Sequence, residues 1–385
     1  MATSIQPLRN DKEIDQQWLE TMLTQKFGNT VEVHSWASTL PNRREGFLSE
    51  IAFVKVKYTV EGSEAVETQL VFKFLPQEAD LRSFLSNGGL AKREVEFYQF
   101  ANSPHFQDIC KKNGIVLPIP ELYYAGYTED AITIVLSDLN VDKYKCVIVK
   151  DGSNFAQTKT ALQAVAVIHA AGVIYIHQHG QDSSLSTLAA EFNTEFYDQF
   201  FLPNLNTLAE KYDGSSMGDS FRAFIPLTKQ IRSTSRKFPL INTIVHGDMW
   251  AGQLLYSDDE SLASIIDWQF CRIDNPVIDI MSMLYMSSDP KLLSENLEQL
   301  LESYWQTFSK VVTAGGVTPD VTFEQLLANV ENMWMYGFMF LAVSIHDFLN
   351  GDNISEYRLF GAMSFLEKNG FFKRFLEKYA SQENI

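Results

Sequence analysis

The residues best suited to chemistry are two aspartates, Asp248 and Asp267, which stand beside short apolar runs. A polar turn at residues 257–261 separates these runs, so residues 254–256 and 264–266 are predicted to form a strand hairpin with both carboxylates at one end. Such a pair suits phosphoryl transfer, because one carboxylate can handle a proton while the other holds a divalent metal. The alternative is an exposed hairpin whose acids face water.

A lysine and a glutamate earlier in the chain extend this pattern. Lys73 stands inside the apolar strand predicted over 69–75, so its ammonium must reach an edge or meet a partner. The helix predicted next, over 90–100, carries Glu94 and Glu96. In kinase folds a strand lysine holds the α- and β-phosphates and is itself held by a helix glutamate. Spacing alone equally allows an exposed lysine and a solvated glutamate, but the order of the elements favours the kinase interpretation.

The string His-Gly-Asp-x-Trp at 246–250, followed by Ile-Asp-Trp-Gln at 266–269, resembles the choline kinase-like and ecdysteroid kinase-like branch of the aminoglycoside phosphotransferase group. These are small-molecule kinases with a protein-kinase-like fold. The resemblance implies that Asp248 is the catalytic base toward the substrate hydroxyl and that Asp267 binds magnesium.

The same resemblance implies a set of ATP-binding residues. The family's helix pattern Glu-x-x-Phe-Tyr falls on Glu94, which would brace Lys73 against the phosphates. A glycine-bearing turn would cover the phosphates, and backbone groups after the strand predicted over 131–136 would meet the adenine. The residues implied at these two places are Gly46 and Ser49 in the turn, and Ser137 and Leu139 after the strand.

The chain departs from the family's pattern at residue 253. The family usually has Asn five residues after the first aspartate, where it helps to hold a second metal, whereas this chain has Gln253. Gln offers the same carbonyl oxygen on a longer arm, and magnesium requires near-ideal octahedral geometry. This departure motivates a second hypothesis, a pseudokinase or scaffold that binds nucleotide or a partner without turnover. The resemblance gives His246 and Asp279 structural roles in supporting the catalytic loop.

The elements that must position these residues predict an α+β, bilobal, protein-kinase-like fold. A small β-rich N-terminal lobe would span 1–139 and bind nucleotide, and a larger helical lobe would span 140–385. Within the helical part, His169 is expected to be a buried, hydrogen-bonded histidine, with His177 and His179 on a polar loop. Helices are expected at 155–171, 188–212, 217–237, 291–312, 322–349 and 356–379.

Composition narrows the class of protein. Hydrophobic residues make up 45% and aromatic residues 13% of the chain, which is typical of a globular protein. The net charge of −17 disfavours binding to nucleic acid or to an anionic membrane. Three widely spaced cysteines without C-x-x-C and an N-terminus without an apolar core favour a cytoplasmic setting. The longest apolar run, 333–345, is shorter than a bilayer-spanning helix.

The sequence therefore predicts a kinase that uses ATP and Mg²⁺ to phosphorylate a hydroxyl of a small molecule. The family's acceptors include choline-like alcohols, ecdysteroids and aminoglycosides, and an anionic acceptor is the least favoured because the chain is acidic. The sequence leaves the acceptor and the oligomeric state open.

Overall fold

The computed structural model describes residues 5–41, 49–181, 185–190, 198–343, 345 and 354–380. Contacts divide the chain into two compact units. The first unit consists of Met1–Asp108, Ile119–Lys145 and Ile266–Cys271, and the second of Ile109–Pro118, Cys146–Ile265 and Arg272–Ile385. The short segment that carries Asp267 therefore belongs to the same unit as the N-terminal strands.

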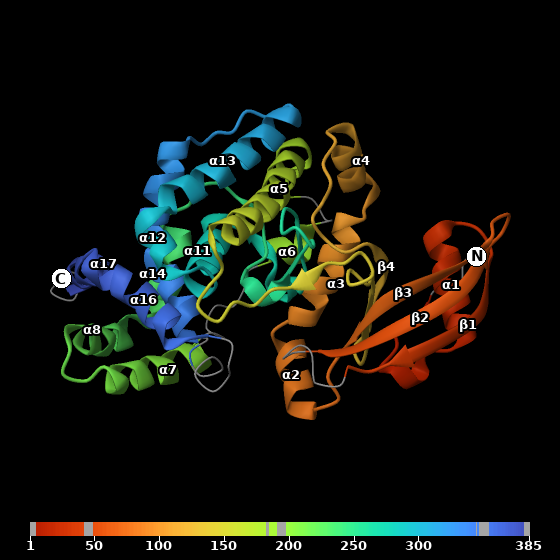
Figure 1. Cartoon of the computed structure of the whole chain (residues 1–385), viewed down its shortest axis with the longest axis horizontal. Coiled ribbons are helices and arrows are strands. Elements are labelled where there is room, and N and C mark those ends of the chain that lie inside the picture. The colour runs from red at the N-terminus through yellow and green to blue at the C-terminus, as the bar shows by residue number, and fades with distance from the viewer. Residues whose placement is uncertain are drawn as a thin grey trace. The chain divides into compact units, whose positions relative to one another are not determined.

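The first unit is built on a five-stranded antiparallel sheet in the order β1-β2-β3-β5-β4 (Figure 1). β-branched and aromatic residues dominate these strands, as expected for a half-buried pleated surface. Lys73 lies on the central strand β3, opposite Ile51 of β2 and Ile134 of β5. The elements of this unit are η1 (Asp11–Glu13), α1 (Gln16–Phe27), β1 (Val31–Thr39), β2 (Glu50–Val60), β3 (Ala65–Phe74), α2 (Ala79–Asn87), α3 (Leu90–Ala101), β4 (Leu122–Tyr127), β5 (Ile132–Ser137) and η6 (Trp268–Phe270). Helix α4 (Pro104–Lys112) and the short strand β6 (Lys145–Cys146) straddle the division between the units.

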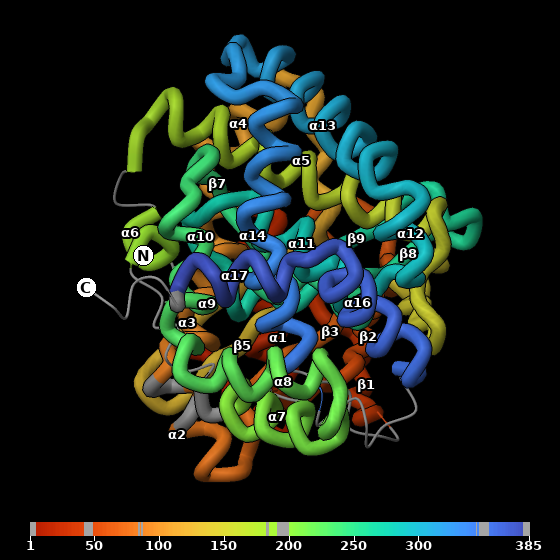
Figure 2. Tube along the Cα trace, turned by 90° about the vertical axis from the view of Figure 1, so that its left-hand side faces the viewer, coloured from red at the N-terminus to blue at the C-terminus, as the bar shows by residue number. Residues whose placement is uncertain are grey.

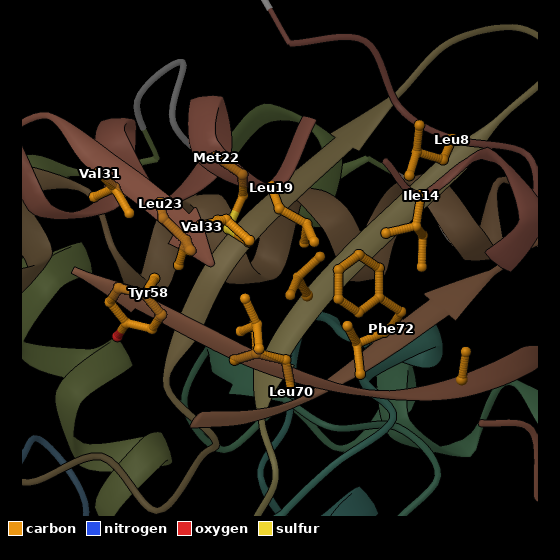
Figure 3. Packing of buried hydrophobic residues seen from close by; sticks show 14 of the residues in the cluster. Leu8, Ile14, Leu19, Met22, Leu23, Val31, Val33, Tyr58, Leu70 and Phe72 are labelled. Carbon is orange, nitrogen blue, oxygen red and sulfur yellow. The ribbon is translucent and has the colours of Figure 1, made fainter. Parts of the chain in front are cut away.

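The core of the first unit lies between α1 and the sheet. Leu19 and Leu23 of α1 pack with Leu70 and Phe72 of β3 in one buried cluster, shown in Figure 3. The side chain of Asp15 caps the start of α1 by accepting a hydrogen bond from the Trp18 N–H at 2.7 Å. Leu70 and Phe72 lie on the face of β3 opposite to that of Lys73, since successive side chains of a strand point to opposite faces of the sheet.

The second unit is mostly helical, with a few short strands. Strand β7 pairs with β10, and β8 pairs with β9, both antiparallel. The strands are β7 (Thr243–Val245), β8 (Leu254–Tyr256), β9 (Ala263–Ile265) and β10 (Arg272–Asp274). The helices are α5 (Phe155–His179), α6 (Ser186–Ala189), α7 (Asp198–Lys211), α8 (Ser216–Phe224), η4 (Ile225–Leu227), α9 (Thr228–Arg232), α10 (Thr234–Lys237), η5 (Ala251–Gln253), α11 (Val277–Met286), α12 (Pro290–Glu295), α13 (Leu297–Ala314), α14 (Phe323–Val343), α16 (Glu356–Lys368) and α17 (Phe371–Ala380).

This order of a β-rich part followed by a larger helical part confirms the predicted α+β class. The helix expected over 217–237 was wrong in its continuity: it is broken into four pieces around Pro226, which lacks a backbone N–H donor. The helix expected over 356–379 is likewise broken, because Gly370 takes the left-handed conformation with φ 69°.

Long helices form the core of the second unit. Helices α5 and α13 run side by side (Figure 1), and α7 and α8 do the same in Figure 2. By length and composition alone, α5 and α14 are apolar enough to cross a membrane. However, 72% of the most apolar 18-residue stretch of each helix is buried inside the structure, as is usual for the central helices of a helical core.

Helix α5 approaches strand β7 closely at Gly172. A Cβ built on Gly172 would lie 2.5 Å from Thr243 Oγ1 and 2.9 Å from the Ile244 backbone nitrogen. We therefore expect Gly172→Ala to lower the free energy of unfolding by about 1–3 kcal/mol through overpacking. Urea-induced unfolding measures the change. The control is Gln178→Ala at an exposed position of the same helix, and an equal effect of the two substitutions would contradict the close approach.

Candidate active site

Three charged side chains of the first unit meet at Lys73. The Lys73 ammonium donates to Glu94 Oε2 at 2.6 Å and also to Asp267 Oδ1. The lysine comes from β3, the glutamate from α3 and the aspartate from the segment after β9. The side chains of Lys73 and Glu94 are 11% and 2% exposed, whereas that of Asp267 is 30% exposed. Of the two carboxylates, Asp267 is thus the one that a ligand can reach.

The carboxylates determine the charge state of the lysine. Burial alone would lower the pKa of Lys73, but the negative charges of Asp267 and Glu94 outweigh burial and hold this pKa above its ordinary value. The ammonium is therefore protonated at neutral pH. A protonated lysine fixed by a buried glutamate is a suitable ligand for phosphate oxygens.

Asp267 is held in an unusual backbone conformation, with φ 65° and ψ 61°. Left-handed conformations of residues other than glycine cost free energy and concentrate at functional sites. Contacts to α3 hold the segment: the Trp268 ring stacks on Phe97 with centroids 3.8 Å apart and planes at 8°. Arg93 Nη1 donates to the Cys271 carbonyl at 3.4 Å, and Cys271 Sγ donates to the Arg93 carbonyl at 3.5 Å. The helix that supplies Glu94 therefore also positions Asp267, which the sequence analysis missed.

In the second unit, the loop after β7 is held by the carboxylate of Asp279 on α11. The His246 N–H donates to Asp279 Oδ2 at 2.6 Å, and the Gly247 N–H donates to Oδ1 at 2.8 Å. His169 Nε2 lies 3.0 Å from the same Oδ2, and its Nδ1 lies 2.8 Å from the Tyr304 hydroxyl. Asp279 and His169 are both fully buried. The prediction that His169 is a buried, hydrogen-bonded histidine is confirmed.

His177 and His179 differ from the expected placement. Both are exposed residues at the end of α5, which continues to His179 and does not stop before a polar loop. The helix continues because residues 172–176 are apolar and carry its buried face onward.

Asp248 and Gln253 lie on the same loop of the second unit. The Asp248 N–H donates to His246 Nδ1 at 3.2 Å, and Gln253 Nε2 donates to Asp248 Oδ2 at 3.4 Å. Asp248 is half-buried, whereas Gln253, at the end of η5, is buried. The amide nitrogen of Gln253 donates to the Asp248 carboxylate, so the amide oxygen is the atom of this side chain that suits a hard metal ion.

The structure brings the predicted site residues together in two sets. Lys73, Glu94 and Asp267 meet in the first unit, and the loop residues meet with Asp279 in the second. Their catalytic, nucleotide-binding and metal-binding roles stay predictions. The members of the second set are His246, Asp248, Gln253 and Asp279.

The remaining predicted ATP-binding residues, Gly46, Ser49, Ser137 and Leu139, belong to neither of these two sets. Gly46 lies outside the described residues, and Ser49 is buried just before β2. The Ser137 hydroxyl accepts a hydrogen bond from the Glu121 N–H at 3.0 Å. The Leu139 carbonyl accepts from two backbone N–H groups of the following turn, whereas its own N–H has no acceptor in the described part of the chain. Leu139 can therefore offer a donor to a base, but no acceptor.

The donor atoms fit a magnesium ion. No group of three or more His, Cys, Asp or Glu residues suited to a metal gathers within the described ranges. Magnesium in nucleotide sites, however, is commonly held by one or two carboxylates together with phosphates and water. The partly exposed carboxylate of Asp267 supplies such a hard oxygen ligand.

Comparisons with known proteins found several solved structures and a family model that match the chain. The solved structures that match include macrolide 2'-phosphotransferase type I (16% identity, 93% of this chain and 98% of that chain covered, TM-score 0.42). They also include a Plasmodium vivax ethanolamine kinase (9% identity, 88% of this chain and 84% of that chain covered, TM-score 0.44). A third is choline kinase LicA from Streptococcus pneumoniae (14% identity, 91% of this chain and 99% of that chain covered, TM-score 0.40). A search of curated proteins found no match. The model of the ecdysteroid kinase-like family matches residues 43–316, which is more than half of the chain. The chain therefore belongs to the ecdysteroid kinase-like family.

Proposed function

We propose that this protein transfers the γ-phosphate of ATP to a hydroxyl group of a small molecule. The observation that carries the proposal is the position of the Lys73 ammonium between the carboxylates of Glu94 and Asp267. One buried carboxylate fixes the lysine, and one partly exposed carboxylate stands beside it. This is the arrangement that a nucleotide triphosphate with its metal requires.

Each residue then has a defined role. Lys73 binds the phosphates and Glu94 holds it in place, while Asp267 and Gln253 are the metal ligands. Magnesium, when bound, would neutralise negative charge on the phosphates. Asp248 orients or deprotonates the acceptor hydroxyl, and Asp279 keeps the backbone of its loop in place through the His246 and Gly247 N–H groups.

The net charge of −17 favours a neutral or cationic acceptor over an anionic one. The second candidate function, nucleotide binding without turnover, is motivated by Gln253 in place of the usual Asn. A Gln253→Asn variant that gains activity over an inactive wild type would support it.

The first test is calorimetric titration of ATP, with and without magnesium, into the wild type and Asp267→Asn. Asn adopts the left-handed conformation more readily than most residues, so this variant retains the backbone at position 267. Because the variant loses the charge that binds the metal, we expect magnesium to strengthen ATP binding to the wild type and to have at least about tenfold less effect on Asp267→Asn.

The matched control is Glu96→Gln on α3, at a glutamate that pairs with Lys92 at 3.5 Å and not with Lys73. This variant should bind ATP as the wild type does. If the wild type binds no ATP, the proposed function is wrong. ATP binding that ignores magnesium would favour the candidate without turnover.

A further inference from the structure

Helix α11 contacts the catalytic loop of the second unit at two places. Near its start, Asp279 accepts hydrogen bonds from the N–H groups of His246 and Gly247. At its other end, the hydroxyl of Ser287, the residue that caps α11, accepts from the Ala251 N–H at 2.7 Å. Ser287 is fully buried. The loop from 246 to 253 is therefore held both before and after Asp248.

The backbone of Ser287 is itself fixed on both sides. Its N–H donates to the Met283 carbonyl at 3.1 Å, and its carbonyl accepts from the Ser153 N–H at 2.7 Å. The segment before Ser153 approaches so closely that a Cβ on Gly152 would lie 2.4 Å from the Asp289 backbone nitrogen. The hydroxyl of Ser287 therefore projects from a rigid support.

The hydrogen bond to Ser287 is made by an N–H group at the start of η5. Ala251 is the first residue of η5, and no side chain of the N-cap residue Trp250 satisfies the first N–H groups of this short helix. Such groups need acceptors when they are buried. The same turn ends at Gln253, whose side chain reaches Asp248. Fixing the Ala251 N–H therefore fixes the turn that spaces Asp248 from Gln253.

We propose that Ser287 is a positioning residue that sets the spacing between Asp248 and Gln253 by accepting the hydrogen bond of the Ala251 N–H. An effect of Ser287 on catalysis rests on the proposed kinase function, whereas its effect on the conformation of the loop does not. Ser287 touches no reacting group, so it acts only through the backbone.

The chain supplies a matched control in the next residue. Ser288 is also buried, but its hydroxyl contacts Thr158 Oγ1 at 3.2 Å and the Met283 carbonyl at 3.4 Å, and it makes no hydrogen bond to the loop within the described residues. Ser287→Ala and Ser288→Ala each remove one buried hydroxyl, so both should lower the melting temperature by similar amounts.

The deciding measurement is hydrogen exchange, followed by mass spectrometry of peptides that cover residues 249–256. We expect about tenfold faster exchange in Ser287→Ala, because a hydrogen bond of typical strength is lost, and unchanged exchange in Ser288→Ala. If Ser287→Ala fails to fold, Ser287→Cys retains nearly the same volume with a weak acceptor and should show the same increase. Equal exchange in the variants of both serines would overturn the proposal.

The kinetic measurement tests the link to catalysis. In an active wild type, Ser287→Ala should lower kcat by about tenfold while the KM for ATP is unchanged, and Ser288→Ala should leave both unchanged. Equal losses in the two variants would contradict a positioning role. If the wild type has no kinase activity, the proposed function fails, and the exchange experiment still decides whether Ser287 holds the loop.

Discussion

Asp248→Asn is expected to lower the rate of phosphoryl transfer by about 10²–10⁴-fold, the usual contribution of a positioned general base. Asn has nearly the same size as Asp and can still accept a hydrogen bond from Gln253, so the loop should retain its conformation. It cannot, however, accept the proton of an acceptor hydroxyl. Steady-state ATP consumption with an acceptor that the wild type phosphorylates measures the change in kcat.

Two further measurements separate loss of the base from general damage. ATP binding to Asp248→Asn should match the wild type, since the predicted phosphate-binding residues Lys73 and Glu94 lie in the other unit. The control is Asp258→Asn in the exposed turn between β8 and β9, which should leave kcat unchanged. If Asp248→Asn turns over acceptor as fast as the wild type, Asp248 is not the base.

The lysine and glutamate of the first unit could be predicted because their signals are local. Lys73 is a charged residue within an apolar strand, and Glu94 lies on a helix that follows later in the chain, so the order of elements along the chain suggested the pair. The strands could be predicted for the same reason: runs of β-branched residues mark them without reference to distant parts of the chain.

The supports of the site could not be predicted, because they depend on residues far apart in sequence. The stack of Trp268 on Phe97 joins two positions 171 residues apart, and neither position carries a periodic or motif signal for the other. The hydrogen bond from Ala251 to Ser287 is of the same kind, since a lone serine at a helix end is compatible with many roles. The left-handed conformation of Asp267 was likewise not predicted, and it accompanies the contacts of Trp268 and Cys271 with α3.

The helix breaks were missed for a different reason. Pro226 and Gly370 are visible in the sequence, but the apolar periodicity continues on both sides of each and outweighed them. Both segments are helical again after the break, so the periodicity indicated helix correctly but not its continuity.

Asp279→Ala is expected to lower the free energy of unfolding by about 3–5 kcal/mol, because it leaves three buried hydrogen-bonding groups without their acceptor. The N–H groups of His246 and Gly247 and the ring of His169 would lose their acceptor without gaining access to water. The loop that carries Asp248 would lose its support, so activity should fall as well. Urea-induced unfolding at pH 7 gives the free energy.

The pH dependence of this difference has a definite sign. Burial would raise the pKa of Asp279, but the interaction with His169, with smaller contributions from His246 and from the N–H of Gly247, brings this pKa below its ordinary value. A carboxylate whose pKa is lower in the folded state adds stability above its unfolded pKa of about 3.9 and loses it as the pH falls toward the folded pKa. The difference between the wild type and Asp279→Ala should therefore be constant near neutral pH and shrink below about pH 4.

The matched control is Asp219→Ala on α8, which removes an aspartate paired with Arg222 at 2.8 Å on the surface of the same unit. Exposed ion pairs add little to stability because water already solvates both charges, so this variant should unfold close to the wild type at every pH. If Asp279→Ala costs no more than Asp219→Ala, the Asp279 carboxylate does not hold the loop. If it costs as much but the difference grows toward low pH, the carboxyl is protonated in the folded state, and the N–H groups of His246 and Gly247 are held by a neutral acid and not by a charge.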